Sequence, residues 1–353
     1  MKIFIVGSGK KGALEDFYVS YLQQAGIDVY HFPALKLFSD YYYKNLINKL
    51  AFKSGLSLIY KKINRLFKKS VEDFRPDLVW VFKGMEIFPS SLEWQKNKKL
   101  KLINYNPDNP FIFSGSGSGN ENITKSIALY DFHFTYNLSV KKQIEEEYKI
   151  RTFFLPFGFD VTEQVYNVCC QENEIEKACF VGNPDKQRAE FLNELVKQGI
   201  EFDVYGTNWK KFIRHKNVTI YPAVIYGDEF WKTLRKYRVQ LNLMRLHNLD
   251  SHNMRSFEVP GIGGIMLAPD TTEHRMFFEN EKEVFLFSDV ITCGQQIRKI
   301  ISLSKHHANQ IREAARSRSL NSGYSYKHRV DYALTEIKSF FEPVVVGKKE
   351  FIN

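Results

Sequence analysis

The chain alternates short apolar runs with helical patterns along its length, and this alternation begins twice. The first beginning, MKIFIVG, places an apolar run at residues 3–6 directly before a glycine, and a second run at 178–182 repeats the arrangement. Neighbouring parallel strands must be joined by a crossover, which is usually a helix. Alternation of this kind indicates a parallel sheet with helices on both faces. The sequence therefore predicts an α/β fold built from two successive βαβ-type units.

The expected strands are the apolar runs that are rich in β-branched and aromatic residues. In the first unit they are residues 3–6, 29–32, 77–82, 102–105 and 132–136. In the second unit they are residues 178–182, 201–205, 239–244, 264–268 and 284–287. Helical patterns at 13–25 and 186–198 follow the first strand of each unit.

The length of 353 residues suits two domains. Residues 155–175 are polar and carry Pro, Gly, Gln and Asn, which favours a domain boundary there. We expect a first Rossmann-like domain at 1–157, a second at 176–330, and a helical segment at 331–353 that packs back on the first domain. Ligands of open α/β sheets bind beyond the carboxyl ends of the strands, so these two domains should face each other across a cleft.

Composition excludes several classes of protein. The apolar start is too short for a secretory signal, and no apolar stretch is long enough to span a membrane. The four cysteines match no zinc spacing, which indicates free thiols in a reducing compartment; they are Cys169, Cys170, Cys179 and Cys293. We expect a cytoplasmic protein, either free or held at the inner face of the membrane.

The net charge of +10 is concentrated in one segment, residues 41–71. This segment holds eight Lys or Arg residues and no acid, and its apolar residues recur at helical spacing. Gly55 is expected to divide it into two helices. Three interpretations remain open: core-facing helices with solvated lysines, a surface for an anionic membrane or acidic glycan, and a surface for nucleic acid. We expect a membrane surface among the partners of the chain, and no nucleic acid.

Gly7 to Gly12 form a literal G-x-G-x-x-G between the first strand and the first helix, which is the dinucleotide-binding pattern. A dinucleotide site also needs an acidic residue at the end of the second strand, for the ribose. Here that strand ends Phe32-Pro33, and Asp28 lies at its other end. An NAD-dependent oxidoreductase remains an alternative, but we expect a tight turn on the acceptor side of the cleft, with Gly9 and Lys10 facing the acceptor.

The most informative stretch, residues 241–278, lies in the second domain. It runs from a buried strand through a polar loop to Arg255-Ser256-Phe257-Glu258 and a glycine pair. The start of a helix can bind a phosphate through its N–H groups and its dipole. Arg255 offers a planar fork of donors for phosphate oxygens, and Glu258 can accept hydrogen bonds from ribose hydroxyls. These residue types together indicate a nucleotide site.

The run R-S-F-E-x-x-x-x-G-G at 255–264 resembles the donor-site signature of GT-B glycosyltransferases of the group 1-like set, in its spore-maturation-type branch. Other segments resemble members of that family in the same order along nearly the whole chain; they are residues 76–84, 104–110, 154–160, 179–183 with Arg188, 204–209 and 323–329. One departure is that Asp250 stands where related group 4-type enzymes carry the first acid of E-x7-E.

The resemblance implies the GT-B fold, a donor site in the second domain and an acceptor site in the first. It implies that a sugar moves from a nucleotide-sugar substrate to a glycan or lipid-linked acceptor, in cell-surface polysaccharide or glycoconjugate synthesis, without a metal or other cofactor. The donor-binding candidates are then Glu258, Arg255, Arg188, Gly182, Asn253, His252 and Gly206. A non-enzymatic protein that binds acidic polymers through residues 41–71 is a further alternative.

Transfer with inversion also needs a base that takes the proton of the acceptor hydroxyl. Asp108 follows an expected strand at the cleft end, so it is the leading candidate, although it can equally cap a turn before Pro110. Glu15, just past the glycine loop, is the fallback. Lys83 follows a buried strand and is expected to contact a phosphate or an acidic acceptor.

Overall fold

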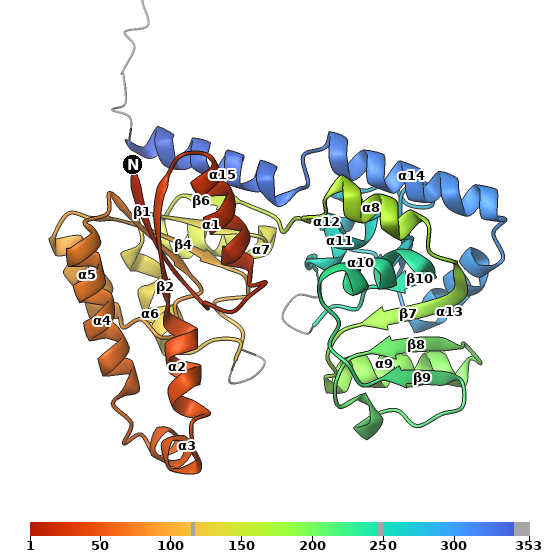
Figure 1. The fold of residues 1–353 in the computed structure, drawn as a ribbon, viewed down its shortest axis with the longest axis horizontal. Helices are drawn as coiled ribbons and strands as arrows, with labels where there is room; N and C mark the ends of the chain where they lie inside the picture. The colour runs from red at the N-terminus through yellow and green to blue at the C-terminus, as the bar shows by residue number, and fades with distance from the viewer. Residues whose placement is uncertain (114–116, 246–249, 342–353) are drawn as a thin grey trace, which may run out of the picture.

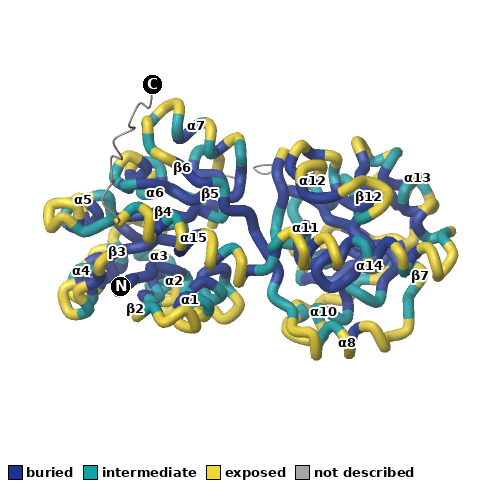
Figure 2. The backbone as a smooth tube through the Cα atoms, turned by 90° about the horizontal axis from the view of Figure 1, so that it is seen from above, coloured by how far each residue is buried: buried dark blue, intermediate teal, exposed yellow. Residues whose placement is uncertain are grey.

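The computed structural model describes residues 1–113, 117–245 and 250–341, which form two lobes joined side by side (Figure 1). Each lobe is built on a six-stranded sheet in which every neighbouring pair of strands is parallel. The strand order is β2-β1-β3-β4-β5-β6 in the first lobe and β12-β11-β10-β7-β8-β9 in the second. Figure 2 shows the strands in the buried interior of each lobe, with the outer turns of the helices exposed.

The first sheet follows from its apolar strands. Its strands are β1 (Lys2–Gly7), β2 (Asp28–Pro33), β3 (Leu78–Phe82), β4 (Lys101–Asn106), β5 (Phe132–Thr135) and β6 (Thr152–Phe154). The central strand β3 reads LVWVF and is buried at every position, as expected for a parallel strand covered on both faces. The covering helices include α1 (Leu14–Gln24), α4 (Ile59–Phe74), α5 (Pro89–Asn97), α6 (Glu121–Ser126) and α7 (Leu138–Tyr148).

The second sheet repeats this construction. Its strands are β7 (Ile175–Val181), β8 (Phe202–Tyr205), β9 (Val218–Tyr221), β10 (Tyr237–Leu241), β11 (Met266–Pro269) and β12 (Phe285–Phe287). Its helices are α8 (Glu163–Cys170), α9 (Lys186–Lys197), α10 (Gly227–Lys236), α11 (Arg255–Gly261), α12 (Thr272–Phe277), α13 (Val290–Ile301) and α14 (Lys305–Asn321).

Every strand expected from the sequence is present, with ends that differ by a few residues. The sequence analysis missed β6 and β9. Both are short strands at the edge of their sheets. Strand β9 alternates half-buried and exposed positions, and β6 has only three residues, which run directly into Leu155-Pro156-Phe157. The sheets and their flanking helices confirm the predicted α/β class with two Rossmann-like lobes.

The chain crosses between the lobes twice, and the two crossing segments are hydrogen-bonded to each other. The Phe159 N–H donates to the Tyr324 carbonyl at 3.3 Å, and the Tyr326 N–H donates to the Phe159 carbonyl at 2.9 Å. A Cβ atom at Gly158 would lie 2.8 Å from the Tyr324 carbonyl oxygen, so only glycine allows this approach. The two crossings therefore act as one joint.

After the second crossing, helix α15 (Tyr326–Phe341) returns to the first lobe, while α14 remains on the second (Figure 1). The Tyr326 ring stacks on Phe17 of α1 at 4.3 Å, and the Phe340 ring lies 5.2 Å from Phe132. The expected C-terminal helical segment thus lies against the first lobe as far as Phe341, and 342–353 are outside the described residues.

The basic segment forms two helices, as Gly55 predicted. They are α3 (Leu46–Lys53) and α4, and Gly55 between them has a φ of +77°. Helix α4 buries Ile59, Ile63 and Phe67 in the first lobe, whereas α3 buries no residue. With α2 (Ala34–Tyr42), α3 forms a projection at the lower left of Figure 1.

A buried ion pair links the start of the second sheet to its last helices. Arg238 is fully buried and donates to both carboxylate oxygens of Glu174, at 2.7 and 2.6 Å, and Arg312 also pairs with this carboxylate. Burial works against the charge of Glu174, but the two arginines outweigh it and lower its pKa to about 2. The carboxylate is therefore ionised at neutral pH.

Replacing Arg238 by Met should lower the free energy of unfolding by about 3 kcal/mol, because it leaves a carboxylate without its main partner. Urea unfolding measures this, and the loss should shrink as the pH falls through the depressed pKa of Glu174, where the carboxyl becomes neutral. Lys186→Met, which removes an exposed pair with Glu190, is the control and should change stability by less than about 1 kcal/mol. Equal losses of stability in the two variants would contradict a stabilising role for the buried Arg238–Glu174 pair.

Candidate functional site

A cleft of about 400 Å³ opens between the lobes, which is large enough for a nucleotide-sized ligand. The first lobe and the joint contribute Gly12, Phe17 and Asp160 to its lining. The second lobe contributes Val181–Asn183, Tyr205, Gly206, Ala223–Gly227, Phe230, Trp231, Met254, Arg255 and Glu258. Four of the predicted donor residues, Glu258, Arg255, Gly182 and Gly206, therefore meet in one cleft.

Arg255 and Glu258 lie three residues apart on α11, which places their side chains on one face of the helix. The Arg255 Nη1 atom pairs with the Glu258 carboxylate, and its guanidinium lies over the Phe230 ring at 4.4 Å. The Arg255 Nε atom is buried without a hydrogen-bond partner among the described residues. A buried donor of this kind is costly unless a water or ligand satisfies it.

Gly182 and Gly206 follow the neighbouring strands β7 and β8 and form the floor of the cleft. The Trp209 Nε1–H donates to the Gly182 carbonyl at 2.7 Å, beneath Gly206. Gly206 has a φ of +151°, and a Cβ there would lie 2.3 Å from the Gly182 oxygen. Any larger residue at 206 would separate the two loops and fill the floor.

Arg188 does not line the cleft. Its Nε and Nη2 atoms donate to the Leu243 carbonyl at 3.1 and 2.7 Å, so the guanidinium holds the loop that follows β10. Burial lowers its pKa to about 10, which leaves it charged at neutral pH. Arg188 Nη1 also donates to the carbonyl of Asn183, which lines the cleft, at 3.4 Å. Its predicted contact with a phosphate stays a prediction.

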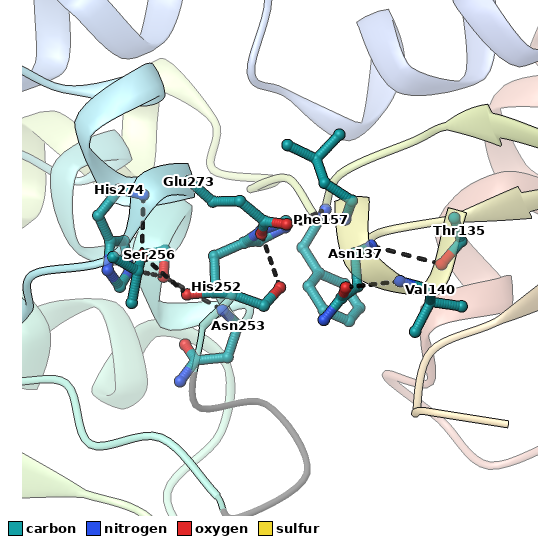
Figure 3. Close-up of polar contacts among 12 residues, drawn as sticks. Thr135, Asn137, Val140, Phe157, His252, Asn253, Ser256, Glu273 and His274 are labelled. Atoms are coloured by element: carbon teal, nitrogen blue, oxygen red, sulfur yellow. Dashed lines mark hydrogen bonds and ion pairs between the residues drawn. The ribbon is translucent and has the colours of Figure 1, made fainter. Parts of the chain in front are cut away.

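His252 and Asn253 are also absent from the cleft lining. His252 is fully buried; its Nδ1–H donates to Glu273 at 2.5 Å, and its Nε2 accepts the Phe157 N–H at 3.2 Å (Figure 3). Burial lowers its pKa despite Glu273, so the ring is neutral. The Asn253 amide donates to Asn242 at 2.7 Å. Both nitrogens of His252 are used within the protein, which corrects its predicted role in donor contact.

Glu273 is the centre of this interdomain network (Figure 3). Its buried carboxylate accepts hydrogen bonds from Ser251 and His252 in the second lobe. The other oxygen accepts the Leu138 N–H at 2.8 Å, at the start of α7 in the first lobe. This role could not be predicted from the sequence, because the partners come from two segments that are distant in sequence from Glu273 and from each other. Asp250, which precedes Ser251, is exposed, and 246–249 lie outside the described residues.

Ser256 fixes the start of α11 from the side opposite the cleft. Its hydroxyl lies 2.8 Å from His274 Nε2 and accepts from Asn242 at 3.0 Å. His274 Nδ1–H donates to the Pro269 carbonyl at 2.7 Å, and burial lowers the pKa of His274 to about 4, so the ring stays neutral. Neutral, fully bonded groups therefore hold Arg255 and Glu258 in place.

The glycine loop of the first lobe is filled by the chain itself. The Glu15 carboxylate accepts hydrogen bonds from the N–H groups of Ser8 and Gly9, where a dinucleotide would place its phosphate. Gly9, with a φ of +66°, packs so closely that a Cβ would lie 2.3 Å from Pro33 Cβ. The dinucleotide interpretation of Gly7–Gly12 therefore fails, and Glu15 is engaged as an anchor of the loop.

The other predicted acceptor-side residues lie at neighbouring strand ends. The Lys83 ammonium, after β3, pairs with Asp108, after β4, at 2.6 Å and donates to the Gly117 carbonyl at 2.6 Å. Lys83 also has a left-handed φ of +63°. Lys10 is exposed in the glycine loop, of which Gly12 reaches the cleft. Lys83 and Asp108 are thus brought together, and both are engaged with each other rather than with the cleft.

Sequence reasoning missed several residues that face the cleft. Phe17 of α1, Phe230 and Trp231 of α10 and the loop Ala223–Gly227 all line it. The loop follows β9, so missing that strand also hid the loop.

Comparison with known proteins agrees with this geometry. The family described as glycosyl transferase-like matches residues 186–335. No curated protein sequence matches the chain. Sucrose-phosphate synthase from Thermosynechococcus elongatus has a TM-score of 0.68 at 12% identity, covering 97% of this chain and 99% of its own.

Two other solved structures share the fold. A UDP-forming α,α-trehalose-phosphate synthase from Burkholderia vietnamiensis has a TM-score of 0.65 at 9% identity, with 96% of this chain and 100% of its own covered. The UDP-GlcNAc 2-epimerase from Neisseria meningitidis, bound to UDP-GlcNAc, has a TM-score of 0.56 at 13% identity, with 96% and 100% covered. The predicted GT-B fold is confirmed. The family match supports the predicted enzyme class over the oxidoreductase and the non-enzymatic alternatives.

Replacing Glu273 by Ala should lower the free energy of unfolding by about 3 kcal/mol, since three donors from two lobes lose their acceptor. Urea unfolding gives the loss, and amide exchange at Leu138 should accelerate. Glu279→Ala, which removes an exposed pair with Lys282, is the control. Unchanged exchange at Leu138 would show that the network does not hold the lobes together.

Proposed function

We propose that this glycosyltransferase of GT-B fold transfers a sugar from a nucleotide-sugar donor, bound against the second lobe, to a glycan or lipid-linked acceptor presented by the first. The observation that carries the proposal is the meeting of Arg255, Glu258, Gly182 and Gly206 in one interdomain cleft. The glycine floor leaves room for a ligand that reaches the ends of β7 and β8. This is where ligands bind in open α/β sheets.

Arg255 and Glu258 suit the two halves of a nucleoside diphosphate. In the free protein they pair with each other, and the Arg255 Nε atom has no partner among the described residues. With a donor bound, the Arg255 guanidinium would donate to phosphate oxygens of the donor. The Glu258 carboxylate would accept hydrogen bonds from the two ribose hydroxyls. The positive charge of Arg255 beside the diphosphate would also stabilise this anionic leaving group as the sugar–phosphate bond breaks.

UDP is the first nucleotide to test, because it appears in the names of the synthase and epimerase neighbours. A thermal-shift panel of UDP, GDP, CMP, ADP and dTDP identifies the base, since a ligand that binds the folded state raises the melting temperature. Conversion of a nucleotide sugar into its epimer, with no glycoside formed, would contradict sugar transfer.

Arg255→Met and Glu258→Gln should each raise the Kd for the stabilising nucleotide by tenfold or more, because hydrogen bonds to charged groups contribute about 1.5–3 kcal/mol. Isothermal titration calorimetry measures the change. Arg275→Met removes an exposed arginine on α12 that pairs with Asp270, and it serves as the matched control. If both cleft variants bind nucleotide as tightly as the control, the site is misplaced.

The second part of the proposal is that the projection around α3 rests on an anionic membrane. Leu46, Ile47 and Leu50 are 74%, 75% and 67% exposed, although they are large and apolar. They lie in the acid-free segment 41–71 with its eight cationic residues. Apolar side chains inside a basic surface suit insertion between anionic headgroups. No helix within the described ranges is long and apolar enough to cross a bilayer.

The triple variant Leu46→Ser, Ile47→Ser, Leu50→Ser should lose most of its binding to vesicles of phosphatidylcholine with phosphatidylglycerol, as measured by co-sedimentation. Wild-type binding should weaken with salt, because exposed charges are screened. Ile291→Ser, which removes an exposed apolar residue of α13, is the control. Vesicle binding that survives the triple substitution, or equal binding to RNA, would contradict a membrane surface.

A further inference from the structure

The second lobe carries a basic segment of its own, residues 204–227, which runs from the end of β8 to the start of α10 and contains no acid. Its Lys and Arg residues are all exposed and fall within 210–216; they are Lys210, Lys211, Arg214 and Lys216. Elsewhere on this lobe, exposed lysines such as Lys186 and Lys197 have an acid about one helical turn away. The positive charge of 210–216 has no such compensation within its segment.

A surface groove of about 410 Å³ lies on this segment. Its lining combines three exposed basic side chains with three β-branched side chains that are buried or half-buried; they are Lys210, Arg214, His215, Ile213, Val218 and Ile220. The neighbouring Phe212 is large and apolar, yet 43% exposed. Basic groups around an apolar interior suit anionic lipids, because the cations can bind headgroup phosphates while the apolar side chains contact the acyl chains.

The basic segment is fixed to the body of the second lobe. Trp209, directly before Lys210, is fully buried, and its Nε1–H donates at 2.7 Å to the carbonyl of Gly182, which lines the cleft. The Phe212 carbonyl accepts a hydrogen bond from the Asn193 side chain of α9 at 3.2 Å. The cations therefore project from a defined surface, and that surface is joined directly to the donor side of the cleft.

The basic segments of the two lobes lie on the same side of the molecule. In Figure 1, α3 is the lowest part of the first lobe, and the short helix η2 (Trp209–Lys211) with the loop after it lies below β9, at the bottom of the second lobe. A single flat surface can therefore contact both segments. Because the cleft is lined by residues of both lobes, it lies between these two contacts.

We propose that residues 210–216 bind the headgroups of anionic lipids, so that the protein contacts the membrane at two points, one on each lobe. The inference rests on the proposed function, which places only the projection around α3 on the membrane. With both lobes on the bilayer, an acceptor anchored in it is presented between the two contacts, beside the cleft. Of the two acceptors proposed for the transfer, this arrangement favours the lipid-linked one.

The test measures binding of the full chain to vesicles of phosphatidylcholine with phosphatidylglycerol. The triple variant Lys210→Gln, Lys211→Gln, Arg214→Gln should bind them about tenfold or more weakly, because the attractions of several cations to an anionic surface add together.

The control removes the same number of charges from α14 and α15, which lie along the upper edge of Figure 1; it is Lys305→Gln, Lys327→Gln, Lys338→Gln. Its binding should change by less than about twofold, because charges remote from the bilayer are screened. Both variants should melt like the wild type, since substitutions of exposed side chains change stability little.

Amide exchange of the wild type locates the contacts without any substitution. On the anionic vesicles, exchange should slow both in α3 and at 210–216, and the slowing at 210–216 should require phosphatidylglycerol. If slowing is confined to α3 and the second-lobe variant binds like the control, the second contact is overturned while the α3 surface stands. A wild type that binds no anionic vesicles refutes both. Tighter binding of RNA than of vesicles, lost in the second-lobe variant, would assign 210–216 to nucleic acid and overturn the inference.

Discussion

The arrangement of the site depends on one constraint, which is that the chain passes between the lobes twice along the same path. The segment around Phe159 and the segment around Tyr324 are hydrogen-bonded side by side, and Gly158 permits the close approach. Glu273 adds a second tie, since its carboxylate receives donors from both lobes. These contacts set α1 and the glycine loop opposite α11. The cleft is therefore a product of the joint as much as of either lobe.

Both lobes begin with an apolar strand that is followed by a glycine and a helix, but the loop after this strand has a different role in each lobe. In the second lobe, Gly182 and Gly206 approach each other closely and leave the floor of the cleft open. In the first, Glu15 fills the corresponding loop. A glycine motif therefore indicates only that two backbone segments lie close together. Whether a ligand can bind there depends on the side chains of the helix that follows the motif, as Glu15 of α1 shows. The filled loop agrees with the expectation of a tight turn, which the missing acidic residue after the second strand had favoured over a dinucleotide site.

Much of the fold was predictable, because buried parallel strands such as β3 must be apolar along their whole length. The edge strand β9 was missed because a half-exposed strand carries no such requirement, and β6 because it has only three residues. Within the site, Arg255 and Glu258 could be found because helical spacing places them on one face. The positions of Arg188 and His252 outside the cleft lining could not be predicted, because their partners are backbone groups distant in sequence, the Leu243 carbonyl and the Phe157 N–H.

The filled glycine loop has a consequence for how a donor can lie in the cleft. A phosphate that approached this loop would compete with a carboxylate attached to the adjoining helix, whose effective concentration is far above that of any free anion. The Ser8 and Gly9 N–H groups are therefore not free to hold a diphosphate, although they would otherwise provide such a site. A donor held as proposed, with its diphosphate at Arg255, would then direct its sugar toward the first lobe.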